Sequence, residues 1–288
     1  MNDSEVLRSL GASGNVLDEL EKYVTNRFQM SNDIPDVVKK EEFISSWEKL
    51  VLDVKKTGIQ QTLNDSISHG EKDIILKNPS DTKIEIYNSI AGPIPIIYTS
   101  CVEDFEELVI KLIHKGKPFP GIEKTGAAFA HGKVVRFIIL SNKPYSNIPA
   151  SKLALDDEKW KEMSMIIRRD HECAHYFTKR FLNNSSMNIH DELMADFAGI
   201  YSADGTYHSR WFLVGMGLDE YPKVKEGRFS VYTNILSEKA KDVLKKLTIK
   251  ISNNIEKWSK TPEAKALSYK EKILFICKNN LIKWYKLY

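Results

Sequence analysis

Apolar residues recur at three- and four-residue steps over long stretches of this chain, which predicts a mainly helical protein. In the N-terminal part this pattern indicates helices over residues 15–28 and 36–56, the second ending before Gly58. In the C-terminal part Ser237 is placed to cap a long amphipathic helix, and the Thr261-Pro262 pair is typical of a fresh helix start. Helices are therefore expected at both ends of the chain.

The pattern changes to strands between residues 81 and 140. Short β-branched segments predict strands around residues 84–90, at 94–99 and at 134–140, with a helix over 103–114 between the second and the third. Residues 116–133 are rich in proline and glycine, and they are expected to form a long loop that either covers a site or lies on the surface.

The clearest helical signal covers residues 156–182. This segment begins with acidic residues, ends with Lys179 and Arg180, and contains neither proline nor glycine, as suits a long helix. Its apolar residues form a stripe, and His171 and His175 fall on or beside it. The stripe consists of Trp160, Met163, Ile167, Ala174, Thr178 and Phe181. Both histidines are therefore expected to face the interior.

These two histidines belong to the motif His171-Glu172-Cys173-Ala174-His175, an HExxH sequence. Residues four apart on a helix lie one turn above each other, so both imidazoles can reach one metal ion. A zinc ion with three protein ligands keeps a position for water and lowers its pKa, and Glu172 stands where a base is needed to take the proton. The motif predicts a catalytic zinc site.

A third ligand is expected from a second helix over residues 188–199, capped by Asn188. Glu192 is the candidate ligand, and Asp196, one turn later, is expected to accept a hydrogen bond from an imidazole, His171 first. Asp191 is the alternative carboxylate. His190 is interpreted as a partly exposed residue at the helix start and not as a ligand.

With Glu192 and Asp196, the HExxH motif resembles the gluzincins, the thermolysin-like clan of zinc metallopeptidases, over about residues 156–205. The interval from His175 to Glu192 is shorter than in thermolysin itself, and the metzincin pattern is absent, because Thr178 and Phe181 stand where it needs Gly and His. The resemblance implies one Zn²⁺ ion, a zincin-like fold with a small sheet before the HExxH helix, and a helical lobe after it. It also implies a strand that lines the cleft and pairs with an extended substrate; the segment 134–140 is the candidate, with a buried core strand as the alternative.

Peptidases of this kind stabilise an oxyanion with donors near the metal. Tyr201 and His208, in a polar and aromatic cluster after the second helix, are the candidates for this role, and the alternative is that both are structural. Arg228 and Tyr232 rank below them.

Composition narrows the class of protein. The 288 residues are 42% hydrophobic, enough for a substantial core, and the net charge of +3 with no nucleic-acid-binding signature disfavours nucleic acid as a partner. An N-terminus without an apolar segment and the lack of eighteen consecutive apolar residues predict a cytoplasmic protein with no membrane span. The three cysteines form no disulfide framework, and Cys173 is expected to be a packed thiol and not a nucleophile.

Together these observations predict an α+β, predominantly helical protein with three regions: a helical region over 1–80, a zincin-like metal-binding core over 81–205 and a helical lobe over 206–288. The expected function is that of a zinc-dependent peptidase acting on a peptide or protein, with Glu172 as general base. The alternatives are a catalytically silent zinc-binding or peptide-interaction protein and a non-peptide hydrolase. Nothing in the sequence selects a substrate or an oligomeric state.

Overall fold

A computed structural model describes residues 2–30, 34–35, 38–67, 73–131, 136–184, 186–223 and 227–287. The chain has an α+β fold and divides into two compact units. One unit is residues 35–173, and the other combines residues 1–34 with residues 174–288. This division differs from the three predicted regions, because the first helices of the chain belong to the same unit as the C-terminal ones. The predicted boundary at residue 80 lies inside the unit of residues 35–173.

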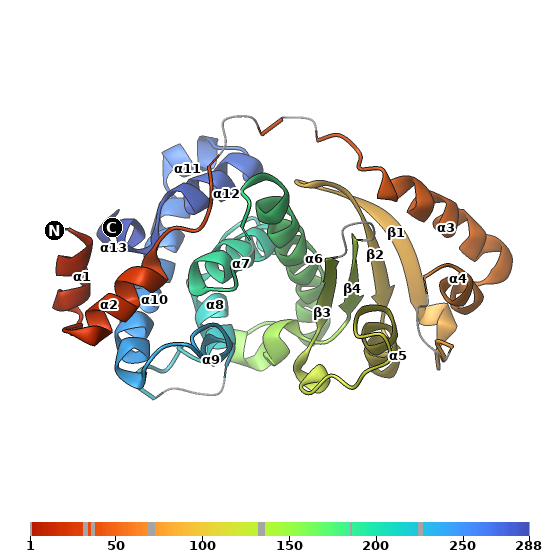
Figure 1. Ribbon diagram of the computed structural model, residues 1–288, viewed down its shortest axis with the longest axis horizontal. Coiled ribbons are helices and arrows are strands. Elements are labelled where there is room, and N and C mark those ends of the chain that lie inside the picture. The colour runs from red at the N-terminus through yellow and green to blue at the C-terminus, as the bar shows by residue number, and fades with distance from the viewer. Residues whose placement is uncertain are drawn as a thin grey trace. The chain divides into compact units, whose positions relative to one another are not determined.

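The unit of residues 35–173 contains a four-stranded mixed sheet in the order β1-β2-β4-β3 (Figure 1). Strands β1 (Thr82–Ser89) and β2 (Gly92–Thr99) form an antiparallel hairpin, and β2 pairs with β4 (Arg136–Ser141) in parallel. Strand β3 (Ala127–His131) pairs antiparallel with β4 and is an edge strand. The predicted strand over 134–140 is thus an interior strand, with Ile138, Ile139 and Leu140 fully buried.

Helices cover both faces of this sheet. Helices α3 (Phe43–Thr57), α4 (Ile59–Ser66) and α5 (Val102–Leu108), the last continued by a π-helical segment Val109–Ile113, share one apolar core with the sheet. That core includes Trp47, Leu63, Ile97, Phe105 and Ile139. On β1, Ile84 and Ile86 point into it, so Tyr87 points to the other face. On that face lies α6 (Asp157–Phe181), and the Tyr87 hydroxyl donates to Asp170 Oδ1 of this helix at 3.0 Å.

Several sequence-based boundaries are corrected here. The predicted loop over 116–133 contains strand β3, whose small residues Ala127, Ala128 and Ala130 gave no strand signal. The helix predicted over 36–56 begins at Phe43, and residues 36–37 and 132–135 lie outside the described part of the chain. The helix predicted over 15–28 is α2 (Asn15–Val24). It ends early where Asn26 Oδ1 accepts the backbone N–H of Phe28 and so competes with the helical pattern.

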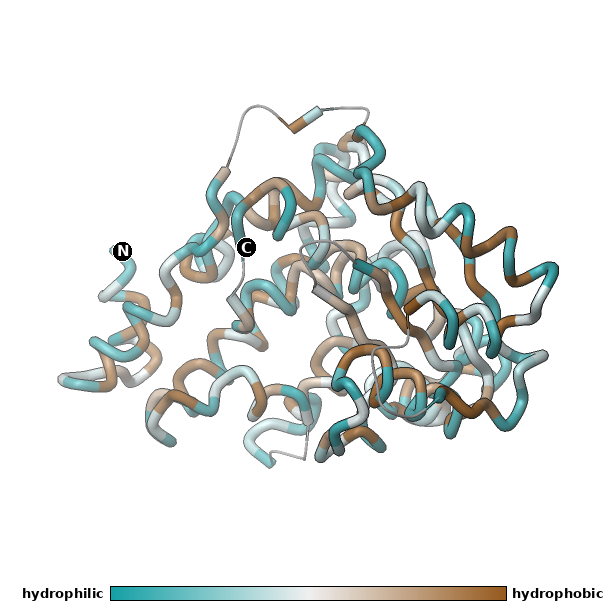
Figure 2. The backbone as a smooth tube through the Cα atoms, turned by 45° about the vertical axis from the view of Figure 1, so that its right-hand side comes forward, coloured by the Kyte–Doolittle hydropathy of each residue, from teal (hydrophilic) through white to brown (hydrophobic). Residues whose placement is uncertain are grey.

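The described part of the other unit is built of helices. They are α1 (Asp3–Ser9), α2, the end of α6, α7 (Ile189–Asp204), α8 (Ser209–Met216), α9 (Phe229–Tyr232), α10 (Glu238–Ser259), α11 (Pro262–Ala266), α12 (Tyr269–Lys278) and α13 (Leu281–Leu287). Apolar and polar residues alternate along them (Figure 2). The predicted caps are confirmed: Ser237 accepts from Ala240 N in α10, and Thr261 accepts from Ala264 N in α11.

Helix α7 is the most buried element of this unit, since every residue from Ile189 to Ile200 is buried. Helix α12 packs against it, and Trp258 of α10 stacks on Phe275 of α12 with ring centroids 4.8 Å apart. Any ionisable side chain on α7 is consequently held in apolar surroundings and needs a partner of opposite charge or a metal.

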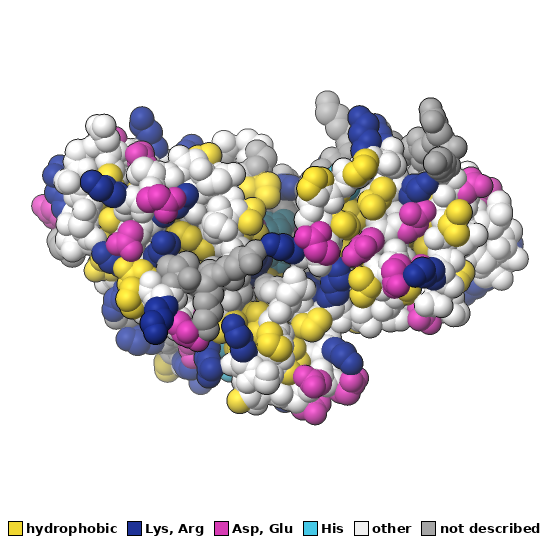
Figure 3. Space-filling model, turned by 90° about the horizontal axis from the view of Figure 1, so that it is seen from below, with side chains coloured by type: hydrophobic (Ala, Val, Ile, Leu, Met, Phe, Trp, Pro, Cys, Tyr) yellow, Lys and Arg dark blue, Asp and Glu magenta, His cyan; other side chains and the backbone are white. Residues whose placement is uncertain are grey.

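The surface and the cysteines agree with the composition. Side chains of both charges are interspersed over the face drawn in Figure 3. Among the described helices, none combines the length and the apolar character that crossing a membrane requires. Cys101, Cys173 and Cys277 are buried free thiols.

Candidate metal centre

Helix α6 carries the HExxH motif in its second half, as predicted. Asp156 Oδ1 accepts the backbone N–H groups of Glu158 and Lys159 and so begins the helix, which runs without interruption to Phe181. The division between the two units falls after Cys173, inside this helix. Because α6 is continuous there, the position of His171 relative to His175 is set by one helical turn.

The first turn of α7 supplies the carboxylate. Asn188 caps this helix as expected, since its Oδ1 accepts the N–H groups of His190 and Asp191 at 2.9 and 3.0 Å. The cap fixes where α7 begins, and therefore which way Glu192 points. The side chains of Glu192 and Asp196 are 4% and 0% exposed, so water contributes almost nothing to their solvation.

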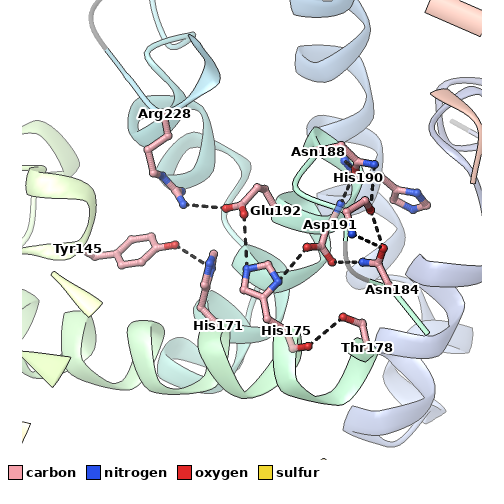
Figure 4. A network of polar contacts seen from close by, with 11 residues as sticks. Tyr145, His171, His175, Thr178, Asn184, Asn188, His190, Asp191, Glu192 and Arg228 are labelled. Carbon is pink, nitrogen blue, oxygen red and sulfur yellow. Dashed lines mark hydrogen bonds and ion pairs between the residues drawn. The ribbon is translucent and has the colours of Figure 1, made fainter. Parts of the chain in front are cut away.

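His171, His175 and Glu192 form a donor set that can hold a metal ion, with one ligand atom from each within 4.8 Å of the other two (Figure 4). His175 Nε2 lies 3.5 Å from Glu192 Oε1. Two ligand atoms bound about 2.0–2.1 Å from a tetrahedral zinc ion lie about 3.4 Å apart, so this spacing suits coordination to a shared ion. Two imidazoles and one carboxylate are also the ligand types of catalytic zinc sites.

The Nδ1 atom of each histidine contacts another side chain. His175 Nδ1 lies 3.0 Å from Asp191 Oδ2, and Asp191 Oδ1 accepts in turn from Asn184 Nδ2 at 2.7 Å. His171 Nδ1 lies 3.1 Å from the Tyr145 hydroxyl. A carboxylate on the outer nitrogen of a ligating imidazole fixes the ring and raises its basicity.

Charges around His175 favour a cation at this position. Burial lowers the pKa of His175, but Asp191 and Glu192 together raise it well above its ordinary value. With this raised pKa the imidazole of His175 carries a proton on both ring nitrogens. A metal ion that binds to one nitrogen has to displace its proton, which is released to water.

Asp191 is the carboxylate on His175, and the predicted orientation of His171 by Asp196 stays a prediction. Asp196 Oδ2 accepts from Arg228 at 2.5 Å, and the same guanidinium lies 3.3 Å from Glu192 Oε2. Spacing alone did not reveal this, because Arg228 lies 36 residues beyond Glu192 in the chain. Asp196 and Glu192 therefore share one arginine.

Glu172 is half-buried and stands next to His171 on α6. Among the described residues it makes no hydrogen bond or ion pair. Its neighbour Cys173 is fully buried, and burial raises the pKa of this thiol well above its ordinary value. As predicted, Cys173 is a packed thiol.

The segment that presents Tyr145 is fastened to α6. The Tyr145 backbone N–H donates to Ser164 Oγ at 2.8 Å, and the Arg168 guanidinium donates to the carbonyls of Ser141, Lys143 and Pro144. A Cβ atom at Gly126 would lie 2.5 Å from Arg168 Nε, so any side chain there would displace this guanidinium. Tyr145 could not be predicted as a site residue, because its contact with α6 depends on the fold.

The remaining candidates lie in other surroundings. His190 is buried, not partly exposed, and its Nε2 is 3.1 Å from the Ile276 carbonyl. Tyr201 follows Glu192 by nine residues, which places it about 180° around α7, where its ring stacks on Phe197. His208 Nε2 lies 2.5 Å from Asp204 Oδ2. A role for Tyr201 or His208 in oxyanion stabilisation stays a prediction.

Comparison with known proteins places the chain in a family. Residues 64–135 and 134–284 match the model of a family of unknown function, DUF7005. The chain belongs to this family. The DUF7005 match includes the HExxH motif, Glu192 and Arg228. No curated protein and no solved structure matches the chain.

Proposed function

We propose that this chain is a zinc-dependent metallohydrolase with a zincin-like fold, and that it acts as a peptidase. His171, His175 and Glu192 would hold one Zn²⁺ ion. One observation carries the proposal: two histidines and a carboxylate have ligand atoms within 4.8 Å of one another, while Asp191 and Tyr145 contact the Nδ1 atoms of the imidazoles. Ion pairs that serve only to satisfy buried charge do not need this arrangement.

The chemistry divides between the ion and the chain. Zinc at this site supplies a Lewis acid that lowers the pKa of a bound water molecule and polarises the substrate carbonyl. Glu172 takes the proton of the attacking water and returns it to the leaving amine. Asp191 keeps the His175 ring in the tautomer with its proton on Nδ1, and Tyr145 accepts the corresponding N–H of His171.

A peptide substrate is supported by the sheet. Strand β3 is the edge strand that pairs with β4 on one side, and on the other side it has no strand neighbour in the described part of the chain. An extended peptide can add to such an edge through main-chain hydrogen bonds, with little demand on its sequence. We therefore assign the pairing with substrate to β3, in place of the interior strand over 134–140.

The alternative is a catalytically silent zinc-binding or peptide-interaction protein. The burial of the donor set favours it, since the His171 and Glu192 residues are only 6% and 3% exposed. A structural zinc site has a closed shell, whereas a hydrolase must admit water and substrate to the ion.

Metal analysis and one matched pair of variants test the proposal. The purified protein should contain about one equivalent of zinc, and it should cleave members of a peptide library in a reaction that a chelator stops and added zinc restores. Glu172→Gln should retain the metal and lose hydrolysis, because it removes a base and not a ligand. Glu162→Gln, the same change at an exposed position of α6, is the control and should keep both.

The outcomes separate the two functions. Wild-type protein that binds zinc and peptides without cleaving them would favour the silent module. Loss of the metal in Glu172→Gln would contradict its role as base, and an absence of zinc binding in the wild type would refute the metal site itself.

A further inference from the structure

Helix α9 and the two residues before it, Gly227–Tyr232, lie against the carboxylate that would bind zinc. Arg228, at the N-cap of α9, reaches Glu192 Oε2 with one terminal nitrogen and Asp196 Oδ2 with the other, at 3.3 and 2.5 Å. Its side chain is 22% exposed, whereas the two carboxylates are 4% and 0% exposed. The guanidinium thus contacts two buried anions and is itself more exposed than either, and Figure 4 shows its contact with Glu192.

The two oxygens of Glu192 have different partners. Oε1 lies 3.5 Å from His175 Nε2, on the side of the donor set, and Oε2 lies against Arg228. Arg228, which holds Oε2, leaves Oε1 on the side of the two histidines.

The backbone of α8 holds the backbone of Arg228 in place. Its N–H donates to the Gly215 carbonyl at 3.1 Å. A Cβ atom at Gly227 would lie 2.4 Å from Gly217 N and from Met216 C, which are backbone atoms that cannot rotate away. The close approach of the two segments therefore needs glycine at position 227, and any side chain there would shift Arg228.

We infer that Arg228 is a positioning residue for the metal site: it holds Glu192 as a one-oxygen ligand, and the seating of Gly227 on α8 makes this possible. The inference rests on the proposed function, since it concerns the same zinc site. It adds a determinant of metal affinity that belongs neither to the HExxH motif nor to the first helix turns that carry Glu192 and Asp196.

A simpler role for Arg228 is charge balance. Glu192 and Asp196 are buried anions, and loss of one cation would destabilise the fold whatever the metal does. A double variant separates the two roles. Arg228→Gln together with Asp196→Asn removes one positive and one negative charge, which restores the balance, but it does not restore the hold on Glu192 Oε2.

The measurement is zinc affinity by competition with a chromophoric chelator, with the unfolding free energy of the metal-free protein measured beside it. Arg228→Gln should weaken zinc binding by about 10–100-fold, the usual effect of losing a partner of a metal ligand. The double variant with Asp196→Asn should regain stability and remain equally weak in zinc binding. Arg228→Lys should recover only part of the affinity, because one ammonium group cannot span both carboxylates in the way that the planar fork does.

Gly227→Ala disturbs the packing of Gly227 on α8 without a change of charge, and it should also weaken zinc binding. Arg180→Gln, an arginine of α6 that stacks on Phe181, is the control and should leave zinc affinity unchanged. Recovery of wild-type zinc affinity in the double variant would overturn the inference and leave charge balance as the explanation. A wild-type protein that binds no zinc would instead refute the proposed function, so the two failures can be told apart.

Discussion

Asp191→Asn is the most informative single change in the site, because Asp191 stands between two donors. Its Oδ2 accepts from His175 Nδ1, and its Oδ1 accepts from Asn184 Nδ2, at 3.0 and 2.7 Å. An asparagine offers one oxygen and one NH₂ group. Whichever way the amide turns, its NH₂ group faces one of these donors, so the substitution leaves a buried donor unsatisfied.

The magnitude follows from that geometry. Asp191 is 4% exposed, so water cannot replace the lost acceptor. A buried unsatisfied donor costs about 1–3 kcal/mol, which is the expected loss in the unfolding free energy of the metal-free protein. Zinc affinity should fall by about 10–100-fold, because His175 loses the carboxylate that makes its ring a better ligand.

The assay combines chelator competition with urea unfolding, and a swapped pair is the control. In Asn184→Asp with Asp191→Asn, the new carboxylate can accept from the new amide, whose oxygen can face His175 Nδ1. Stability should then return in part, while zinc affinity stays low because the charge has moved away from the ring. Wild-type zinc affinity in Asp191→Asn would refute this account of the site.

Three further predictions concern the supports of the site and the surface. Gly126→Ala should lower the unfolding free energy by roughly 2–4 kcal/mol, because the new methyl group displaces Arg168 from the carbonyls that it binds. This magnitude corresponds to the loss of one or two charge-assisted hydrogen bonds. An unchanged urea midpoint would contradict this prediction. Asn188→Ala should cost about 1 kcal/mol because two N–H groups at the start of α7 lose their acceptor, whereas Asn188→Asp, which keeps an oxygen there, should be nearly neutral in the same measurement. The hydrogen bond from Lys77 lowers the pKa of Glu103 from 4.5 to about 2, so this pair contributes stability that is present above pH 4.5 and lost as the pH falls toward 2. Unfolding curves over that range should differ in slope between the wild type and Glu103→Gln, and parallel curves would count against the pair.

The sequence predicted those parts of the site whose geometry is set by residues close together in the chain. The spacing of His171 and His175 needs only one helical turn, and the Asn188 cap fixes the start of α7 through contacts within four residues. Both helices, and the grouping of Glu192 with the two histidines, could therefore be predicted from the chain alone.

The partners that complete the site could not be predicted, because each comes from a distant part of the sequence. Tyr145 reaches His171 through a segment held by Arg168, and Arg228 reaches Glu192 from α9. The strand β3 was missed for a different reason. Its alanines have no strong strand preference, and its place in the sheet is decided by pairing with β4.

The order of the chain has a consequence for its synthesis. Residues 35–173 are contiguous and can complete their own sheet and core as they leave the ribosome, but residues 1–34 belong with residues 174–288. Until that last segment is made, α2 with its buried Leu17, Leu20 and Val24 can pack against α1 but lacks α10, its other helical neighbour. His175, Asp191, Glu192 and Arg228 all belong to this second unit, so most of the donor set is synthesised only after residues 35–173 are complete.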